Sequence, residues 1–279
     1  MVLAAGLGTR LRPLTEDCAK ALVPVGDRPA LAHVLGRLRA AGISRVVVNA
    51  HHHVDQLRAF AEGQAEVDLA LSQETELLGT AGGIAHAAGL LGEGNLLLWN
   101  ADILADVDVH ALLGAHRDEA TLVVQPLEPG QGSVGLDEAG RVVRLRKESF
   151  AAEARGGQFL GIHVLGQALR ARLPARGGLI EDVYLPALGR GDVLRAHVFE
   201  GPWHDIGTVD SYLDANLAWL AARGLEHWTG PGARVAGRVV LDRAVVGEGA
   251  AVTGSGALRR CVVWPGANAV APLEDRVTA

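Results

Sequence analysis

Short apolar runs alternate with helix-like stretches through the first two-thirds of the chain, and this pattern constrains the fold more than any other. Strands and helices in alternation imply a mainly parallel sheet with helices on both faces. We therefore predict a Rossmann-like α/β domain. The expected strands cover residues 2–4, 45–49, 67–71, 95–99 and 121–124, and the expected helices cover residues 29–41, 53–61 and 81–91.

Later segments complete this domain. Two alternating runs between residues 134 and 145 flank the turn sequence EAG and predict a β-hairpin inserted over the sheet. Strands at residues 159–164 and 193–199 and a helix from 209 to about 222 follow. The sequence GPG at residues 230–232 then marks a boundary, so we expect the main domain to span residues 1–228.

The remaining residues, 229–279, carry a six-residue repeat with small residues and glycines between its apolar positions. This is the signature of a left-handed parallel β-helix, in which each side of a triangular coil puts one apolar residue inward. A ragged β-tail is the alternative. About two coils are too few to stand alone, which favours support from the main domain or a homo-oligomer assembled through this tail. The repeat positions are Val240, Val246, Val252, Leu258, Trp264 and Val270.

Composition excludes several classes of function. The net charge of −6 includes no basic block, so we expect neither nucleic acid nor a membrane surface as a partner. No run approaches the roughly 18 apolar residues of a membrane helix, and the start does not resemble a signal peptide. Cys18 and Cys261 lack metal-type spacing, which indicates no disulfide framework and a cytoplasmic protein.

A glycine-rich segment follows the first expected strand. Its sequence GLGTR, residues 6–10, lets backbone N–H groups approach phosphate oxygens without a Cβ in the way. It is not a Walker A motif, and Leu11 stands where the dinucleotide fingerprint has its third glycine. Alone it fits a structural turn equally well. Arg10, Arg12 and Lys20 add three cations nearby in sequence and favour phosphate binding.

These residues belong to a longer pattern. The segments AAGLGTRLRPLT at residues 4–15 and KALVPV at residues 20–25 resemble the signature of the nucleotide-sugar pyrophosphorylases, which are sugar-1-phosphate nucleotidyltransferases. Further pieces follow in the family's order: LGTAGG at 78–83, NAD at 100–102, FLGI at 159–162 and WHDIGT at 203–208. The resemblance covers about residues 1–222, and many members carry β-helical tails. It implies a nucleotidyltransferase type A-like fold and an activity of the EC 2.7.7 class.

The resemblance also implies roles for individual residues. In the family's reaction a sugar 1-phosphate attacks the α-phosphorus of an NTP, so cations must offset the repulsion between two anions. Arg10 and Lys20 are similar in position to the catalytic phosphate ligands, with Lys20 the transition-state contact. Asp102 and Asp205 are expected to meet and hold Mg²⁺, the implied cofactor, although a lone Asp at a strand end is otherwise a helix cap. The implied nucleotide-binding residues are Ala4, Ala5, Gly6, Gly8, Thr9, Gly79, Thr80 and Gly82.

The segment at residues 79–83 is implied to lie against the nucleobase, while Thr80 also suits the N-cap of the following helix. Asn100 and Gly161 resemble sugar contacts, and Glu148 with Lys147 is expected to approach the sugar or its phosphate. Many relatives carry Glu-Lys-Pro there, where this chain has RKES at residues 146–149.

Other conspicuous side chains receive no catalytic role. The run HHH at residues 51–53 suits a metal by residue type, but the nearest carboxylate is Asp55, and a polar loop at a helix start is favoured. Trp99 and Trp203 flank the expected metal ligands, where buried aromatics usually serve packing.

The substrate pair stays open between two main alternatives. LGTAG with Glu74 upstream resembles the mannose-1-phosphate guanylyltransferases and favours GTP with mannose 1-phosphate or a related sugar. NAHH at residues 49–52 resembles the N-acetylmuramate 1-phosphate uridylyltransferases and suggests UTP with that or another hexose 1-phosphate. A non-catalytic regulatory subunit is a further alternative, although all four catalytic and metal residues are present. A phosphocholine-type substrate would need an aromatic cage, and aromatic residues make up only 4% of the chain.

Overall fold

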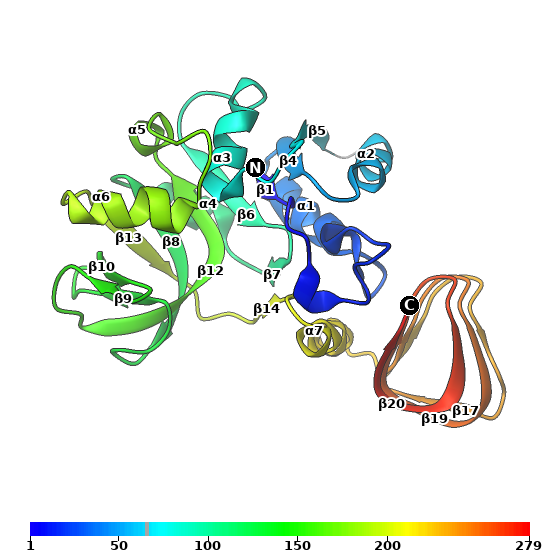
Figure 1. Cartoon of the computed structure of the whole chain (residues 1–279). Coiled ribbons are helices and arrows are strands. Elements are labelled where there is room, and N and C mark those ends of the chain that lie inside the picture. The colour runs from blue at the N-terminus through cyan, green and yellow to red at the C-terminus, as the bar shows by residue number, and fades with distance from the viewer. Residues whose placement is uncertain (65–66) are drawn as a thin grey trace. The chain divides into compact units, whose positions relative to one another are not determined.

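In the computed structural model, which describes residues 1–64 and 67–279, the strand–helix alternation forms one ten-stranded mixed sheet (Figure 1). The order along the sheet is β11-β10-β9-β12-β6-β1-β4-β5, with β8 beside β12 and β13 beside β8. Each strand predicted within residues 1–222 overlaps an observed one. The strands are β1 (Val2–Leu3), β4 (Arg45–Ala50), β5 (Asp68–Gln73), β6 (Leu96–Asn100), β8 (Ala120–Leu127), β9 (Val134–Leu136), β10 (Val142–Leu145), β11 (Glu148–Ser149), β12 (Arg155–Leu165) and β13 (Leu194–Val198).

The centre of this sheet is parallel, as the alternation predicted. Strand β1 runs parallel to both β4 and β6, and β5 continues parallel to β4. Val46, Val47 and Val48 are all buried, because a central parallel strand is covered on both faces. The carboxyl ends of β1, β4 and β6 therefore open on one edge, where ligands bind in such sheets.

The predicted hairpin at residues 134–145 is confirmed, but its expected place over the sheet is wrong. Strands β9 and β10 pair antiparallel, and β9 also pairs antiparallel with β12. The hairpin therefore extends the sheet edge. The physical reason lies in β12, which is long enough to pair with β9 at residues 155–157 and with β6 at residues 162–165, while β8 pairs along most of its length.

Helices pack against the sheet through apolar faces. Ala81 and Ile84 share one core with buried residues of β6, β8 and β12 and with Tyr184 and Ala187. No helix of the described residues is long and apolar enough to cross a membrane. The helices that follow or precede these strands are α1 (Ala30–Ala40), α2 (Val54–Glu62), α3 (Gly79–His86), α4 (Val109–Ala115), α5 (Gln167–Arg170) and α6 (Leu185–Gly189), with the short helices η3 (Ala87–Gly89) and η4 (Ile180–Tyr184).

The chain divides into two compact units, Met1–Leu7 with Val34–Trp203, and Gly8–His33 with His204–Ala279. The second unit joins the segment after the glycines to helix α7 (Val209–Ala221). Gly26 N–H donates to the buried Asn216 side chain at 2.9 Å, and the Tyr212 hydroxyl donates to Pro24 O at 2.5 Å. These bonds hold the N-terminal segment of this unit on α7. Its short elements are η1 (Thr9–Leu11), η2 (Lys20–Leu22), β2 (Pro24–Val25) and β3 (Arg28–Pro29).

The tail forms a curled parallel sheet of the β-helix type, which Figure 1 shows as stacked triangular coils. Its core includes Val246, Val252 and Leu258, as the repeat predicted. Both cysteines of the protein are free thiols. The strands are β15 (Trp228–Thr229), β16 (Arg234–Val235), β17 (Val239–Asp242), β18 (Val245–Val246), β19 (Ala251–Val263) and β20 (Asn268–Thr278).

The other three repeat positions were predicted wrongly. Val240 and Val270 are 63% and 64% exposed, and Trp264 packs edge-on against the Tyr212 ring of α7. Stacked partners such as Val245 and Val262 lie 17 residues apart, one short of three hexads. A strict six-residue spacing therefore slips relative to the coil.

Candidate active site

Two buried residues, Leu11 and Thr15, fix the conformation of the glycine loop at Gly8. Gly8 adopts a left-handed conformation with φ of 64°, and its carbonyl accepts hydrogen bonds from Leu11 N–H at 2.9 Å and the Thr15 hydroxyl at 2.8 Å. Leu11 and Thr15 are buried, whereas Arg10 is exposed. A Cβ at Gly8 would lie 3.2 Å from the Lys20 Cβ, so Lys20 stands directly beside the loop.

Two predicted site residues, Arg10 and Asp205, lie far apart in sequence but come together in the second unit. A Cβ at Gly207 would lie 3.0 Å from Arg10 Nη2 and 3.1 Å from Asp205 Oδ1. Gly207 is buried, and its missing side chain leaves room for both groups. The loop cation and the carboxylate of the WHDIGT segment thus converge on one glycine.

The rest of that segment begins helix α7. The Thr208 hydroxyl accepts from Ser211 N–H at 3.2 Å, and Ser211 Oγ accepts from Gly207 N–H and Thr208 N–H, which is a capping box. The positive end of the helix dipole favours negative charge here. Burial lowers the pKa of His204, and Asp214 opposes the shift only in part, so the neutral form of this side chain is favoured next to Asp205.

In the first unit, Asn100 ends β6, and Asp102 lies on the turn between β6 and β7 (Ile103–Ala105). Ala101 N–H donates to Leu3 O at 3.0 Å, which ties the turn to β1. The buried Trp99 ring donates from Nε1 to Ile103 O at 2.9 Å, and this bond closes the turn across its two ends. Trp99 therefore has a role that its residue type alone did not reveal.

The two predicted sugar contacts Asn100 and Gly161 lie together. Gly161 has φ of 75°, and a Cβ there would overlap the Asn100 side-chain amide. Strand β12 bulges at this point, since Phe159 pairs with Val124 but His163 pairs with Leu122. Bulges of this kind re-aim side chains and often lie beside active sites. The FLGI segment is thus the bulge itself.

Directly after the bulge in sequence, His163 forms a buried hydrogen bond with Tyr184, with 2.7 Å between His163 Nδ1 and the Tyr184 hydroxyl. Burial, helped by the positive N-terminus, lowers the pKa of His163 to about 3, so the ring is neutral near pH 7. This pair belongs to the core that supports β12.

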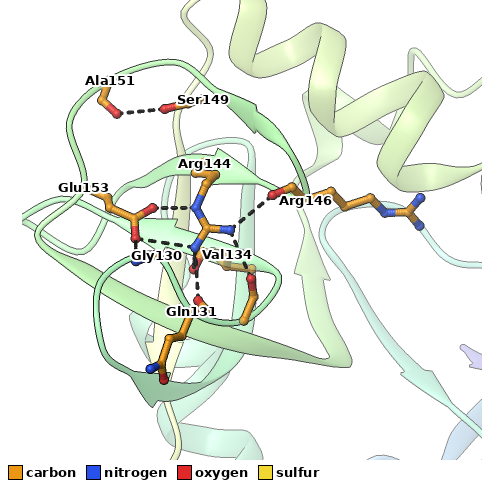
Figure 2. Close-up of polar contacts among 9 residues, drawn as sticks. Gly130, Gln131, Val134, Arg144, Arg146, Ser149, Ala151 and Glu153 are labelled. Atoms are coloured by element: carbon orange, nitrogen blue, oxygen red, sulfur yellow. Dashed lines mark hydrogen bonds and ion pairs between the residues drawn. The ribbon is translucent and has the colours of Figure 1, made fainter.

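Arg144 and Glu153 form an ion pair that organises the loop between β8 and β9 (Figure 2). The Arg144 guanidinium donates to Glu153 Oε2 at 2.5 Å and to the carbonyls of Gln131, Gly132, Val134 and Arg146, at 3.0 to 3.2 Å. Arg144 also holds the pKa of Glu153 below its usual range. The loop in turn presents the Ser133 hydroxyl to Phe159 N–H at 3.0 Å, next to Gly161.

The expected base-facing segment is packed against the chain near Gly177. Ala81 N–H and Gly82 N–H point to Gly177 O at 3.0 and 3.4 Å, and the Thr80 hydroxyl accepts from Leu179 N–H at 2.7 Å. The alternative role of Thr80 as an N-cap is wrong, because Leu78 occupies the cap position. Gly79 and Thr80 are exposed, whereas Gly82 is buried. Contacts to a nucleotide remain a prediction for all three.

Two further groups of residues stood out in the sequence, Glu148 and the histidine run at residues 51–53. Glu148 is exposed on β11, with β10 and β9 between it and β12 in the sheet order, so its sugar contact remains a prediction. His51 Nδ1 is 3.1 Å from Glu74 O, and the His52 and His53 rings are 3.9 Å apart. The described residues contain no group of three or more His, Cys, Asp or Glu placed to hold a metal.

Comparison with known proteins identifies the family of this chain. A family model described as nucleotidyl transferase matches residues 1–222. The chain belongs to the nucleotidyl transferase family. The kinship with sugar-1-phosphate nucleotidyltransferases, an enzyme class within EC 2.7.7, that the motifs predicted is therefore confirmed.

Two mannose-1-phosphate guanylyltransferases are among the proteins similar in sequence to this chain. Mannose-1-phosphate guanylyltransferase catalytic subunit beta of Drosophila pseudoobscura pseudoobscura is 31% identical over 265 residues, covering 89% of this chain and 70% of that protein. Mannose-1-phosphate guanylyltransferase 1 of Arabidopsis thaliana is 30% identical over 267 residues, covering 89% and 73%. A solved structure of HddC from Yersinia pseudotuberculosis, complexed with GMP-PN, shares the fold. Its TM-score is 0.66 at 21% identity, over 78% of this chain and 97% of that one.

Proposed function

We propose that this nucleotidyltransferase joins GTP and mannose 1-phosphate, or a closely related sugar 1-phosphate, to give a GDP-sugar and pyrophosphate. The convergence of Arg10 and Asp205 on Gly207 carries the chemical part of the proposal. The choice of GTP and mannose 1-phosphate is supported by the names of the relatives, which match 89% of this chain.

In the proposed reaction an oxygen of the sugar 1-phosphate attacks the α-phosphorus of GTP in line. A new P–O bond forms, the bond to the bridging oxygen of the β-phosphate breaks, and pyrophosphate leaves. Both reactants are anions, so fixed cations lower the barrier by offsetting repulsion and stabilising the transition state. We assign this role to Arg10 and Lys20, and nucleotide binding to the backbone of the loop, residues 4–9.

We assign Mg²⁺ to Asp102 and Asp205. The donor set fits, because Mg²⁺ is usually held by one or two carboxylates together with substrate phosphates. Both side chains are half-buried; a hydrogen bond from Trp99 closes the turn that contains Asp102, and the capping box of Thr208 fixes the start of α7 shortly after Asp205. When bound, the ion would supply charge neutralisation at the phosphate oxygens.

For the sugar we assign Asn100 and Gly161, which the bulge brings together, and Glu148 as a further contact. The alternative of UTP with N-acetylmuramate 1-phosphate or another hexose 1-phosphate rests on the NAHH segment. A regulatory subunit without activity is the second alternative. We further propose a cytoplasmic enzyme, consistent with its free thiols, and a homo-oligomer that assembles through the β-helix-like tail.

A pyrophosphate-release screen tests the proposal. Each of the common NTPs is combined with a panel of sugar 1-phosphates in the presence of Mg²⁺, and the same pairs are repeated with EDTA. We expect the highest kcat/KM for GTP with mannose 1-phosphate and loss of turnover with EDTA. A preference for UTP would support the first alternative. The absence of release with every pair would leave the regulatory subunit.

A further inference from the structure

We propose that Asn49 and Glu74 form a buried positioning pair that fixes the start of the glycine loop relative to the segment at residues 78–83. The inference rests on the proposed function in one respect, since it takes these two segments as the phosphate side and the base side of one nucleotide site. The pair would make NTP binding depend on a hydrogen bond that no substrate touches.

A continuous chain of hydrogen bonds supports the proposal. Ala4 N–H donates to Asn49 Oδ1 at 2.8 Å, and Asn49 Nδ2 donates to Glu74 Oε1 at 2.7 Å. Leu78 N–H then donates to Glu74 Oε2 at 3.2 Å. The chain thus runs from the end of β1 through the ends of β4 and β5 to the residue that precedes α3.

The pair is closed off from water. Asn49 is 3% exposed and Glu74 is 2% exposed. Gly83 makes room for it, because a Cβ at that position would lie 2.6 Å from Glu74 Oε1 and 2.9 Å from Asn49 Nδ2. Burying a carboxylate is costly and contributes little to stability by itself, so the gain lies in placement.

The chemistry of the chain permits only certain residue pairs. Both ends of the chain are backbone donors, at Ala4 and Leu78, so the two side chains must present an acceptor at each end and one donor between them. An amide with a carboxylate meets this requirement in either order. Two amides leave donors facing each other, and two carboxylates leave no donor between them. Each mismatch leaves a buried polar group unsatisfied.

This logic gives a test by exchange of the two groups. We expect Glu74→Gln and Asn49→Asp each to raise the KM for NTP about tenfold, with a smaller change in the KM for the sugar 1-phosphate. The double variant restores every bond with the carboxylate at residue 49, and its KM for NTP is expected within about threefold of the wild-type value.

A double variant as impaired as the two single variants combined would overturn the proposal, and so would single variants with an unchanged KM for NTP. Gly83→Ala provides a second approach, because it displaces the pair without altering its charge. We expect it to raise the KM for NTP in the same way, and an unchanged value would count against the pair.

Hydrogen exchange separates this proposal from the proposed function. The amides of Ala4 and Leu78 are expected to lose protection together in each single variant and to regain it in the double variant, whether or not any substrate pair reacts. If the wild-type protein releases no pyrophosphate but exchange follows this pattern, the assigned reaction fails while the coupling of the two segments stands. Loss of protection at only the nearer amide in each single variant would refute the coupling.

Discussion

Two glycine-rich segments of this protein look alike in sequence and differ in structure. In the loop at residues 6–8, a Cβ at Gly6 would meet no heavy atom of the described residues within 4 Å, apart from those of its chain neighbours. In the segment at residues 79–83, added Cβ atoms would collide with the backbone near Gly177, with Arg176, or with the Asn49–Glu74 pair. At Gly6 the first segment leaves its backbone open, although Gly8 packs against Thr15 and Lys20. The second segment uses missing side chains to let the chain pack on itself.

The difference shows that glycine serves two purposes within one proposed nucleotide site. Open glycines let an incoming phosphate approach the backbone. Packed glycines let the segment at residues 79–83 lie close against the neighbouring chain. A substitution at the open Gly6 should therefore affect ligands without disturbing the fold, whereas one at a packed glycine of the second segment should also displace the neighbouring chain.

A large effect on stability is expected from Gly82→Ala. The new Cβ would lie 2.8 Å from Ala175 O and 2.9 Å from the Arg176 Cα, so backbone must move. We expect the free energy of unfolding to fall by about 1–3 kcal/mol, measured by urea denaturation. Gly36→Ala is the matched control, since it lies in α1 and its Cβ would meet no described atom within 4 Å. There the free energy of unfolding should rise by about 0.5–1 kcal/mol. Equal changes in the free energy of unfolding for Gly82→Ala and Gly36→Ala would contradict the distinction between packed and open glycines.

A smaller effect, confined to ligand binding, is expected from Gly6→Ala. Its methyl group meets open space in the protein but stands where a phosphate is proposed to bind. We expect the KM for NTP to rise about tenfold, equal to about 1.4 kcal/mol, with an unchanged melting temperature. Gly92→Ala, at another open and exposed glycine, should change neither quantity. A normal KM in Gly6→Ala would remove this glycine from the proposed site.

Much of the fold could be predicted because its signals are local. The apolar run at Val46, Val47 and Val48 identifies a central strand, and the turn at Gly140 identifies a hairpin. The hairpin's partner and the exposure of Val240 and Val270 could not be predicted in this way. They depend on pairing across the sheet and on a coil of 17 residues, neither of which the local spacing encodes.

The candidate site could likewise be predicted only where its signals are local in sequence. The motifs indicated Arg10, Lys20 and Asp205 by residue type and resemblance, and the structure brings Arg10 and Asp205 to one glycine. The supports of the site were missed, because each one depends on a contact between distant segments. Trp99 closes a turn through its ring N–H, and Arg144 binds the carbonyls of Gln131, Gly132, Val134 and Arg146, which lie at the two ends of the β9–β10 hairpin.

The most direct test of the account is the turnover of Lys20→Ala. Pyrophosphate release from GTP and mannose 1-phosphate should fall about a hundredfold to a thousandfold in kcat/KM, as expected when one cation that stabilises the transition state is removed. Arg238→Ala, which removes an exposed cation from the tail, is the matched control and should retain wild-type turnover. Near-normal turnover in a folded Lys20→Ala protein would contradict the assignment of the loop to nucleotidyl transfer.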